Sequence, residues 1–318
     1  MRSRYQLDPE VAAALAPLAA KAAEALPIER GDWRALRDRA NANLAFLATL
    51  NAPDAGEVRT QSLSITVDDG ADVAARWYTR GDERSGSAVV YAHGGGMIAG
   101  NLDVYDAVIA EYVAATRVPF LSVDYRLAPE AQGPRPARDV FAAIQWLSDL
   151  SSELGVDLDR IAVMGDSGGG GVAASAAIIA RDLGVGLARQ ILIYPMLDDR
   201  TVVGDSAREP FLSWTYDMNF TGWSARLGEQ LGRDDVLPAA APARLTDFRG
   251  LASAYLEVGD LDIFRDESLI YAQRLAAAEV PLELHVHPGA PHGFERFAPG
   301  SQLAQRAMQD RLRVIRSF

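Results

Sequence analysis

A serine flanked by glycines, each two positions away, is the first feature of the sequence that could perform chemistry. It is Ser167 in the stretch Gly165–Gly169, which follows the apolar segment Ile161–Met164. A G-x-S-x-G pattern between a strand and a helix holds the serine on a sharp turn with its hydroxyl exposed. Larger residues at the glycine positions would collide with the neighbouring strand and helix. The pattern therefore predicts a nucleophilic serine.

The same stretch permits a second interpretation. Gly168, Gly170 and Ala173 match the G-x-G-x-x-A fingerprint of dinucleotide-binding proteins, which also opens a helix after a strand. That fingerprint requires an acidic residue at the end of the next strand, where this sequence has Tyr194 and Pro195. It also normally lies in the first βαβ unit rather than in mid-chain. The nucleophilic serine is the favoured interpretation.

A run of glycines could supply a second part of the same chemistry. His93 and the three glycines Gly94–Gly96 directly follow the apolar segment Ala88–Ala92. Unshielded backbone N–H groups are the donors that acyl-transfer enzymes aim at a developing oxyanion. We expect the glycines to provide such donors, and the His93 ring to hydrogen-bond within the loop as a structural group.

A serine nucleophile needs a base, and the sequence has four histidines. His285 and His287 alternate on one predicted strand and face the same side of it, which is typical of packed strand residues. They could also ligate a metal, but we find no suitably spaced cysteine or acid, so no metal is expected. His292 lies in a loop after the last predicted strand, where a base could reach a serine at the sheet edge.

An acidic residue has to hold the base in one tautomer. Asp260 and Asp262 both follow the apolar strand Ala254–Val258, and spacing alone does not distinguish them. Asp266 and Glu267 fall in the first turn of a predicted helix, where acids are common because of the helix dipole. Either Asp260 or Asp262 could therefore complete a Ser–His–Asp triad.

The composition narrows the remaining function classes. The 318 residues are 49% apolar and 23% charged, so a full hydrophobic core is available. The net charge of −12 disfavours nucleic-acid and membrane partners, which carry negative charge themselves. Cysteine is absent, and Lys21 is the only lysine, which excludes thiolate nucleophiles and leaves no Walker-type phosphate loop. Acidic residues and a proline interrupt residues 1–26, which predicts an amphipathic helix in a cytoplasmic protein rather than a signal peptide.

Hydrophobic periodicity predicts the elements that must position these residues. About fifty helical residues precede two strands that form an antiparallel opening, and apolar strands then alternate with amphipathic helices. This alternation predicts an α/β fold with a mostly parallel sheet covered on both faces. The expected strands are Ser62–Val67, Val73–Thr79, Ala88–Ala92, Val118–Val123, Ile161–Met164, Ile191–Tyr194, Ala254–Val258 and Leu282–Val286. The expected helices are Tyr105–Thr116, Val140–Leu154, Gly170–Leu183, Asp266–Ala278 and Gln302–Ile315.

A segment of about sixty residues between Tyr194 and Ala254 is too long for an ordinary connection. We interpret it as an inserted helical cap that packs with the N-terminal helices. The N-terminal segment 1–55 is thus expected to belong to the cap, and residues 56–318 to form the core, with the insertion at about 198–248. The insertion carries the aromatic residues Phe211, Trp214, Tyr216, Phe220 and Trp223.

Together these motifs resemble the hormone-sensitive-lipase family of the α/β-hydrolase superfamily, the GDSAG-type bacterial esterases. The resemblance runs from about residue 60 to the C-terminus, and it implies an eight-stranded sheet with a helical cap built from the N-terminus and from an insertion after the sixth strand. It also implies Ser167 as nucleophile, His292 as base and Asp262, rather than Asp260, as the orienting acid. The motifs, in the family's order, are His93–Gly96, Asp124–Glu130, the Ser167 elbow, Tyr194–Met196, Asp262–Glu267 and His292–Phe294.

The resemblance further implies an oxyanion hole and shows where this chain departs from the family. The implied donors are the N–H groups of Gly94, Gly95 and Gly168. Gly168 stands in place of the usual alanine, which leaves the backbone donor intact. Ile263 replaces a proline. Met97 replaces an aromatic residue that is common after the glycines, so the resemblance does not determine the shape of the substrate pocket. The expected pocket residues are Met97, Asp166, Phe211 and Trp214.

The activity implied by the resemblance is that of a serine carboxylesterase. It would cleave small-molecule esters of short to medium acyl chain through an acyl-enzyme, without a cofactor. An amide or lactone hydrolase would use the same residues. The alternative from another class is a non-catalytic small-ligand receptor on this fold. Such relatives lack the catalytic histidine, so the presence of Ser167, Asp262 and His292 argues against this alternative. The sequence leaves the oligomeric state open, with a homodimer as one candidate.

Overall fold

The computed structural model describes residues 5–23, 27–50, 57–81 and 85–318. The expected boundary between residues 55 and 56 lies outside these ranges, as do residues 24–26 at the end of the expected N-terminal helix. Within the described ranges, no helix is long and apolar enough to cross a membrane.

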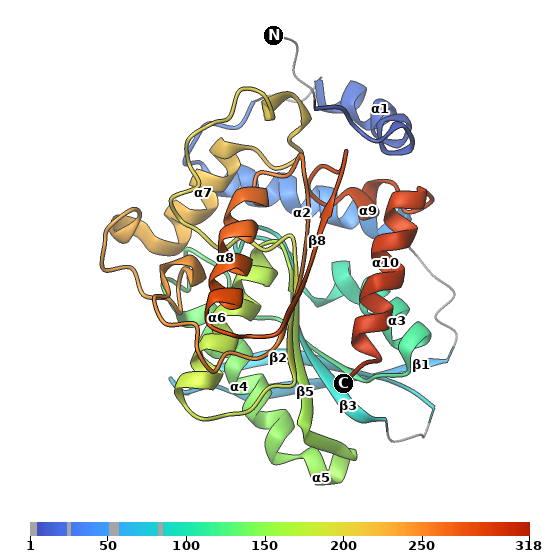
Figure 1. Ribbon diagram of the computed structural model, residues 1–318, viewed down its shortest axis with the longest axis vertical. Coiled ribbons are helices and arrows are strands. Elements are labelled where there is room, and N and C mark those ends of the chain that lie inside the picture. Colours follow the sequence, from blue (N-terminus) through green and yellow to red (C-terminus); the bar gives the residue numbers. More distant parts are fainter. Residues whose placement is uncertain (1–4, 24–26, 51–56, 82–84) are drawn as a thin grey trace.

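A single eight-stranded sheet lies at the centre of the fold, with the strand order β1-β2-β4-β3-β5-β6-β7-β8 (Figure 1). β2 is antiparallel to β1 and to β4, and all other neighbours are parallel, which confirms the predicted architecture. β5 begins five residues earlier than predicted because Gly86 also pairs with Val156 beyond a register irregularity. The strands are Val58–Thr66 (β1), Asp72–Arg80 (β2), Gly86–Ala92 (β3), Phe120–Val123 (β4), Val156–Asp166 (β5), Arg189–Ile193 (β6), Ala254–Gly259 (β7) and Leu282–His287 (β8).

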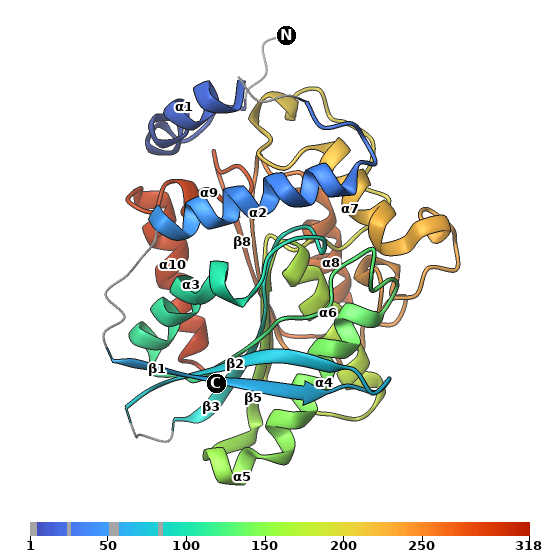
Figure 2. The ribbon, with the colours of Figure 1, turned by 180° about the vertical axis from the view of Figure 1, so that it is seen from behind.

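Helices cover both faces of the sheet. α3 and α10 lie on one face, and α4, α6 and α8 lie on the other (Figures 1 and 2). The α-helices are Pro9–Ala23 (α1), Trp33–Leu50 (α2), Leu102–Thr116 (α3), Arg135–Asp149 (α4), Ser151–Leu154 (α5), Gly168–Asp182 (α6), Tyr216–Leu227 (α7), Arg265–Ala277 (α8), Phe294–Phe297 (α9) and Gln302–Ile315 (α10). Three short 3₁₀ helices are Glu209–Phe211 (η1), Gly228–Gln230 (η2) and Pro242–Arg244 (η3).

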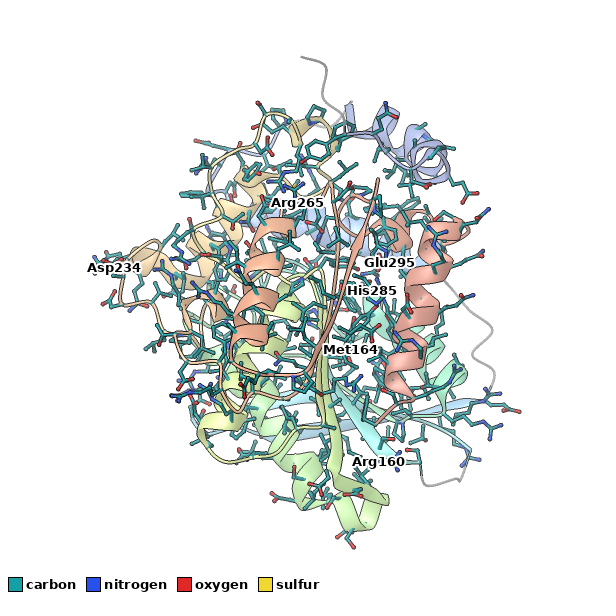
Figure 3. All side chains as sticks on the ribbon, in the orientation of Figure 1. Arg160, Met164, Asp234, Arg265, His285 and Glu295 are labelled. Atoms are coloured by element: carbon teal, nitrogen blue, oxygen red, sulfur yellow. The ribbon has the colours of Figure 1, made fainter. Side chains whose placement is uncertain are left out.

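The core sits on both faces because the strands are apolar on both sides. Val89 belongs to the cluster on the α3 and α10 face, whereas its neighbour Val90 belongs to the cluster on the α4 and α6 face. This alternation follows from the two-residue period of a strand. Met164 is fully buried at the centre of the molecule, and Asp234 lies at its periphery (Figure 3). The continuous apolar runs of the sequence therefore correspond to the central strands, which are buried on both faces.

The cap packs over the carboxyl end of the parallel strands. α2 crosses that end, next to α7 of the insertion between β6 and β7 (Figures 1 and 2). One buried cluster joins α2, α7 and the loops after β3 and β4, so these segments pack as a unit; its members are Leu36, Ile98, Ala99, Ala128 and Ala225.

Candidate active site

Ser167 occupies a strained turn between β5 and α6. Its backbone has φ 55° and ψ −121°, a conformation that residues other than glycine rarely adopt. A β carbon on Gly165 would lie 2.3 Å from the Gly169 oxygen, and one on Gly169 would lie 2.1 Å from the Ala92 oxygen. The glycines around the serine are therefore required by the close packing of β3, β5 and α6.

Three side chains from separate loops converge at this turn. His292 Nε2 lies 2.9 Å from Ser167 Oγ, and His292 Nδ1 lies 2.7 Å from Asp262 Oδ2. Asp262 follows β7, and His292 follows β8, so neighbouring parallel strands deliver both to the same sheet edge. This is the geometry in which a carboxylate orients an imidazole and the imidazole can take a proton from the serine hydroxyl.

The structure distinguishes the two candidate aspartates. Asp262 is fully buried, and its second oxygen accepts the Phe264 N–H at 2.9 Å. Its backbone carbonyl accepts a hydrogen bond from Arg208 at 3.1 Å. Asp260 instead accepts the Gly289 N–H at 2.7 Å. Asp262 is therefore the aspartate that the fold brings to His292.

Aromatic rings and a cap residue hold the imidazole in place. The rings of Tyr194 and Phe264 meet His292 edge-on at centroid distances of 4.7 and 5.1 Å. Ser213 of the insertion donates its hydroxyl to the His292 carbonyl at 2.7 Å. The His292 side chain is only 12% exposed. Its orientation is thus set by packing as well as by Asp262.

The surroundings raise the pKa of His292 above its ordinary value. Burial alone lowers this pKa, because it disfavours the charged imidazolium. The charge and hydrogen bond of Asp262 outweigh burial, and the charges of Glu295 and Asp166 act in the same direction. The site therefore stabilises the imidazolium that forms when His292 accepts a proton.

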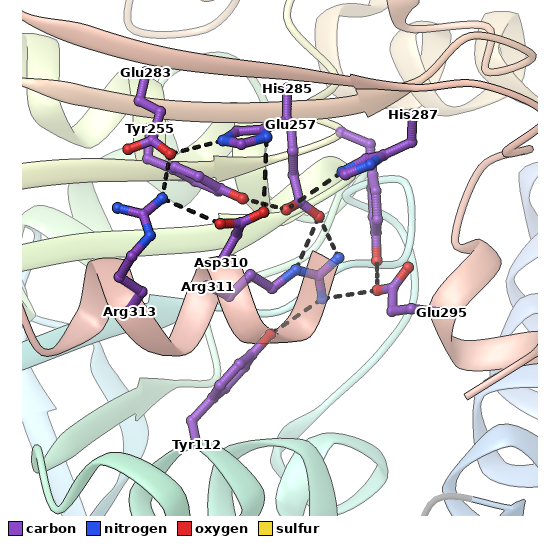
Figure 4. A network of polar contacts seen from close by, with 11 residues as sticks. Tyr112, Tyr255, Glu257, Glu283, His285, His287, Glu295, Asp310, Arg311 and Arg313 are labelled. Carbon is purple, nitrogen blue, oxygen red and sulfur yellow. Dashed lines mark hydrogen bonds and ion pairs between the residues drawn. The ribbon is translucent and has the colours of Figure 1, made fainter. Parts of the chain in front are cut away.

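A buried ion-pair network lies close to His292 (Figure 4). Arg311 of α10 donates to Glu257 at 2.9 Å and to Glu295 at 3.0 Å. Glu295 also accepts the Tyr194 hydroxyl at 2.5 Å, and the Tyr194 ring contacts His292. This network fixes the tyrosine that packs against the imidazole.

Asp166 joins the serine turn to the glycine loop after β3. Its carboxylate accepts the hydroxyls of Tyr91 at 2.5 Å and Tyr105 at 2.8 Å, and the Gly94 N–H at 3.1 Å. The Gly94 N–H is thus already used, so the prediction that Gly94 donates to an oxyanion is wrong. The sequence could not show this, because the bond joins residues that are 72 positions apart.

The next glycines of the loop keep their donors available. Among the described residues, the N–H groups of Gly95 and Gly96 make no hydrogen bond. Gly168 opens α6, and the first N–H groups of a helix lack an intrahelical acceptor. A β carbon on Gly168 would lie 2.9 Å from the Gly96 nitrogen, which shows how closely the two segments approach. Gly96 was not predicted as a donor, because residue type alone does not distinguish consecutive glycines.

A cavity of about 120 Å³ opens next to Ser167 and His292. Of the four predicted pocket residues, Asp166 and Trp214 line it. Met97 and Phe211 are not among the residues that line this cavity. Met97 has φ 64° and belongs to the buried cluster on the α4 and α6 face, and Phe211 lies in η1.

The wall that α2 provides to the cavity was not predicted from the sequence. The wall residues recur three or four positions apart, which is one face of an amphipathic helix. This signal is present in the sequence, but nothing local indicates that the face points toward the serine. The α2 residues that line the cavity are Leu36, Arg39, Ala40, Asn43, Leu44 and Leu47.

The remaining histidines have structural surroundings. His93 Nδ1 lies 2.8 Å from the Gly94 oxygen, and its ring stacks on Tyr125 at 4.5 Å, which confirms the predicted structural role. His287 faces Glu257 at 3.9 Å.

His285 has acidic neighbours that the sequence analysis did not find. Among the described residues, Glu283, His285 and Asp310 have ligand atoms within 4.8 Å of one another, a spacing that a metal could use. The expectation that no acidic partner accompanies His285 is therefore wrong. Arg313, however, already pairs with both carboxylates (Figure 4). Ion pairs thus account for the cluster.

Comparison with known proteins places the chain in a family. Residues 89–296 match the family described as alpha/beta hydrolase fold, and the chain belongs to this family, in its hormone-sensitive-lipase branch. It is 37% identical over 221 residues to esterase LipI of Mycobacterium tuberculosis, covering 68% of each chain. It is 30% identical over 305 residues to ethyl acetate hydrolase of Pseudomonas putida, covering 92% of each. Among solved structures, a bacterial heroin esterase superimposes with a TM-score of 0.85 at 33% identity, covering 98% of this chain and 97% of the other.

We predict that the His292 imidazole titrates above the ordinary histidine pKa of about 6.5. Asp262→Asn removes the charge that raises this pKa and is expected to lower it, whereas Asp260→Asn is expected to leave it unchanged. NMR titration of the imidazole nitrogens measures the pKa of His292 in the wild type and in both variants. An identical His292 pKa in the wild type and in Asp262→Asn would contradict the electrostatic description of the site.

Proposed function

We propose that Ser167, His292 and Asp262 are the nucleophile, the general base and the orienting acid of this hydrolase. The chain is a carboxylic ester hydrolase. The observation that supports the three roles is the hydrogen-bonded path from Ser167 Oγ to His292 and on to Asp262, at 2.9 and 2.7 Å, with the serine on a strained turn.

In the proposed reaction, Ser167 Oγ attacks the ester carbonyl while His292 Nε2 takes the hydroxyl proton. Collapse of the tetrahedral intermediate breaks the bond to the alcohol oxygen, which receives that proton from His292. The product of this half is an acyl-enzyme. Water then attacks the acyl carbon with His292 as base, the acid is released, and the proton returns to Ser167. Asp262 keeps Nδ1 protonated throughout and stabilises the imidazolium.

The proposed oxyanion donors are the N–H groups of Gly95, Gly96 and Gly168. Gly94 is excluded because its N–H is bound by Asp166. Preorganised donors of this kind contribute because negative charge develops on the carbonyl oxygen in the transition state, and removing one donor typically slows turnover about 10²- to 10³-fold.

The substrates we propose are esters with short to medium acyl chains. The cavity beside Ser167 and His292 has a volume of about 120 Å³. Its wall is largely apolar, from α2 and from Trp214 and Met218 of the cap. The relative named ethyl acetate hydrolase supports a short acyl group.

Amide or lactone hydrolysis would use the same three residues, and substrate panels separate these reactions. The intact hydrogen-bonded path from Ser167 to Asp262 argues against a non-catalytic receptor.

A cytoplasmic location and a homodimer are further parts of the proposal. Among the strands of the described residues, β8 ends the sheet and pairs with β7 alone, and an open strand edge of this kind can pair with a second copy.

Replacing the proposed nucleophile tests the mechanism. We expect Ser167→Ala to fold normally and to lower kcat by about 10⁴-fold or more, because no acyl-enzyme can form. Hydrolysis of p-nitrophenyl acetate measures kcat, and circular dichroism checks the fold. Wild-type turnover in this variant would exclude a serine mechanism.

The pH profile follows from the position of His292. Neutral His292 is the base, so kcat/KM is expected to rise as this group loses its proton, and the raised pKa places the rise above the ordinary value of about 6.5. Asp262→Asn is expected to reduce kcat by about 10⁴-fold, the loss seen when a triad aspartate becomes asparagine. Asp260→Asn is the matched control, with a far smaller effect. Reversed effects of the two variants would assign the acid to Asp260.

Acyl-chain dependence tests the role of the cavity. We predict the fastest hydrolysis for acyl chains of roughly two to eight carbons, since longer chains exceed the pocket. Initial rates on p-nitrophenyl esters from acetate to palmitate measure this. A maximum at palmitate, with a rate increase above the micellar threshold, would identify a lipase and contradict the proposed pocket.

A further inference from the structure

Arg37, on the cap helix α2, binds the loop that carries the proposed oxyanion donors. Its Nε donates to the carbonyl oxygen of Ile98 at 2.6 Å, and its Nη2 donates to the carbonyl oxygen of Ala128 at 2.6 Å. Ile98 lies two residues after Gly96, the last glycine of the loop, and Ala128 lies in the loop after β4. One cap side chain therefore holds two loops of the core.

A carboxylate fixes the direction of this guanidinium. Glu130 accepts from Arg37 Nη1 at 2.8 Å and from Nη2 at 2.6 Å, a bidentate pair with defined geometry. The hydrogen bond from Arg37 lowers the pKa of Glu130, so the carboxylate stays ionised. The Arg37 side chain is 21% exposed, which leaves most of the group packed between α2 and the core.

The bond to Ile98 bears on the orientation of the Gly96 N–H. The carbonyl of Gly95 accepts the N–H groups of Ile98 at 3.1 Å and of Ala99 at 3.0 Å, which closes a tight turn. The Gly95 carbonyl and the Gly96 N–H belong to one planar trans peptide, so they point in opposite directions. Holding the turn through the Ile98 carbonyl thus fixes the direction of the Gly96 donor.

Further contacts tie the same loop to the same helix. Asn41, one helical turn after Arg37, accepts the Gly100 N–H through its side-chain oxygen at 2.9 Å. The loop after β4 reinforces this, because Ala128 donates its N–H to the Met97 carbonyl at 2.9 Å. The loop is held by α2 on both sides of Ala99.

We propose that Arg37 is a positioning residue for the oxyanion hole, so that docking of α2 completes the catalytic geometry rather than only covering the pocket. The inference rests on the proposed donor role of Gly95 and Gly96. If Arg37 only anchored the cap, its loss would raise KM or lower the melting temperature and leave the chemical step intact. If it positions the donors, its loss weakens binding of the tetrahedral oxyanion and lowers kcat.

The experiment compares Arg37→Met with the wild type and with a matched control. Methionine keeps a long flexible side chain but makes none of the four hydrogen bonds. The control is Arg30→Met, which removes another cap contact, the exposed pair of Arg30 with Asp217 at 3.0 Å. Kinetics with p-nitrophenyl acetate give kcat and KM, and inhibition by phenylboronic acid, which forms a tetrahedral adduct on serine, reports binding of a transition-state mimic.

We expect Arg37→Met to lower kcat about 10- to 100-fold with KM within about twofold, as for a donor displaced by a fraction of an ångström to 1 Å. Affinity for phenylboronic acid is expected to fall by a similar factor, and Arg37→Lys to restore part of both. Arg30→Met is expected to match the wild type. Glu130→Gln, which keeps the two carbonyl contacts, is expected to show a smaller loss of kcat and serves if Arg37→Met does not fold.

Unchanged kcat and boronate affinity in the folded variants would overturn the proposal. An increase confined to KM would do the same, because it would assign Arg37 to cap anchoring alone. Failure of the proposed function is a separate result, seen when Ser167→Ala retains turnover while Arg37 has not been altered.

Discussion

The backbone conformation of Ser167 is the constraint on which the rest of the site depends. A non-glycine residue with φ 55° is strained by about 1 to 3 kcal/mol, so the surroundings must hold it there. Its N–H donates to the Ile193 carbonyl at 2.9 Å, and its own carbonyl accepts the N–H groups of Met196 at 2.9 Å and Gly171 at 3.1 Å. The turn cannot relax without breaking contacts to the end of β6 and to α6.

Acidic side chains around His292 influence its pKa. Asp262, Glu295 and Asp166 all favour the imidazolium of His292 over its neutral form. Such stabilisation favours proton transfer to His292, but it also reduces the fraction of neutral His292 at lower pH. Burial opposes it, and buried Arg311 pairs with Glu295 in the same region. The balance of these effects leaves the pKa of His292 above its ordinary value.

Local pattern and chain order were enough to predict the sheet, the serine turn and His292. They could not separate Asp260 from Asp262, because the difference lies in how the loop after β7 turns: one carboxylate meets Gly289 and the other meets the imidazole. The proposed oxyanion donors differ from the predicted set by one glycine, since the bond from Gly94 to Asp166 depends on contacts between distant segments. Spacing identifies residues that belong to a site, and packing decides which atoms remain free in it.

The cap helix α2 contacts both the proposed substrate cavity and the loop that carries the proposed oxyanion donors. Leu36 and Ala40 line the cavity, while Arg37 and Asn41, the next residue in each case, bind the loop beside the proposed donors. Two adjacent faces of one helix, each with a four-residue repeat, thus meet the proposed substrate cavity and the loop of the proposed oxyanion donors. A change that tilts the helix to enlarge the pocket also moves the groups that hold the loop. Altered acyl selectivity without loss of rate therefore requires substitutions that leave the helix axis in place, such as changes of side-chain volume on the cavity face alone.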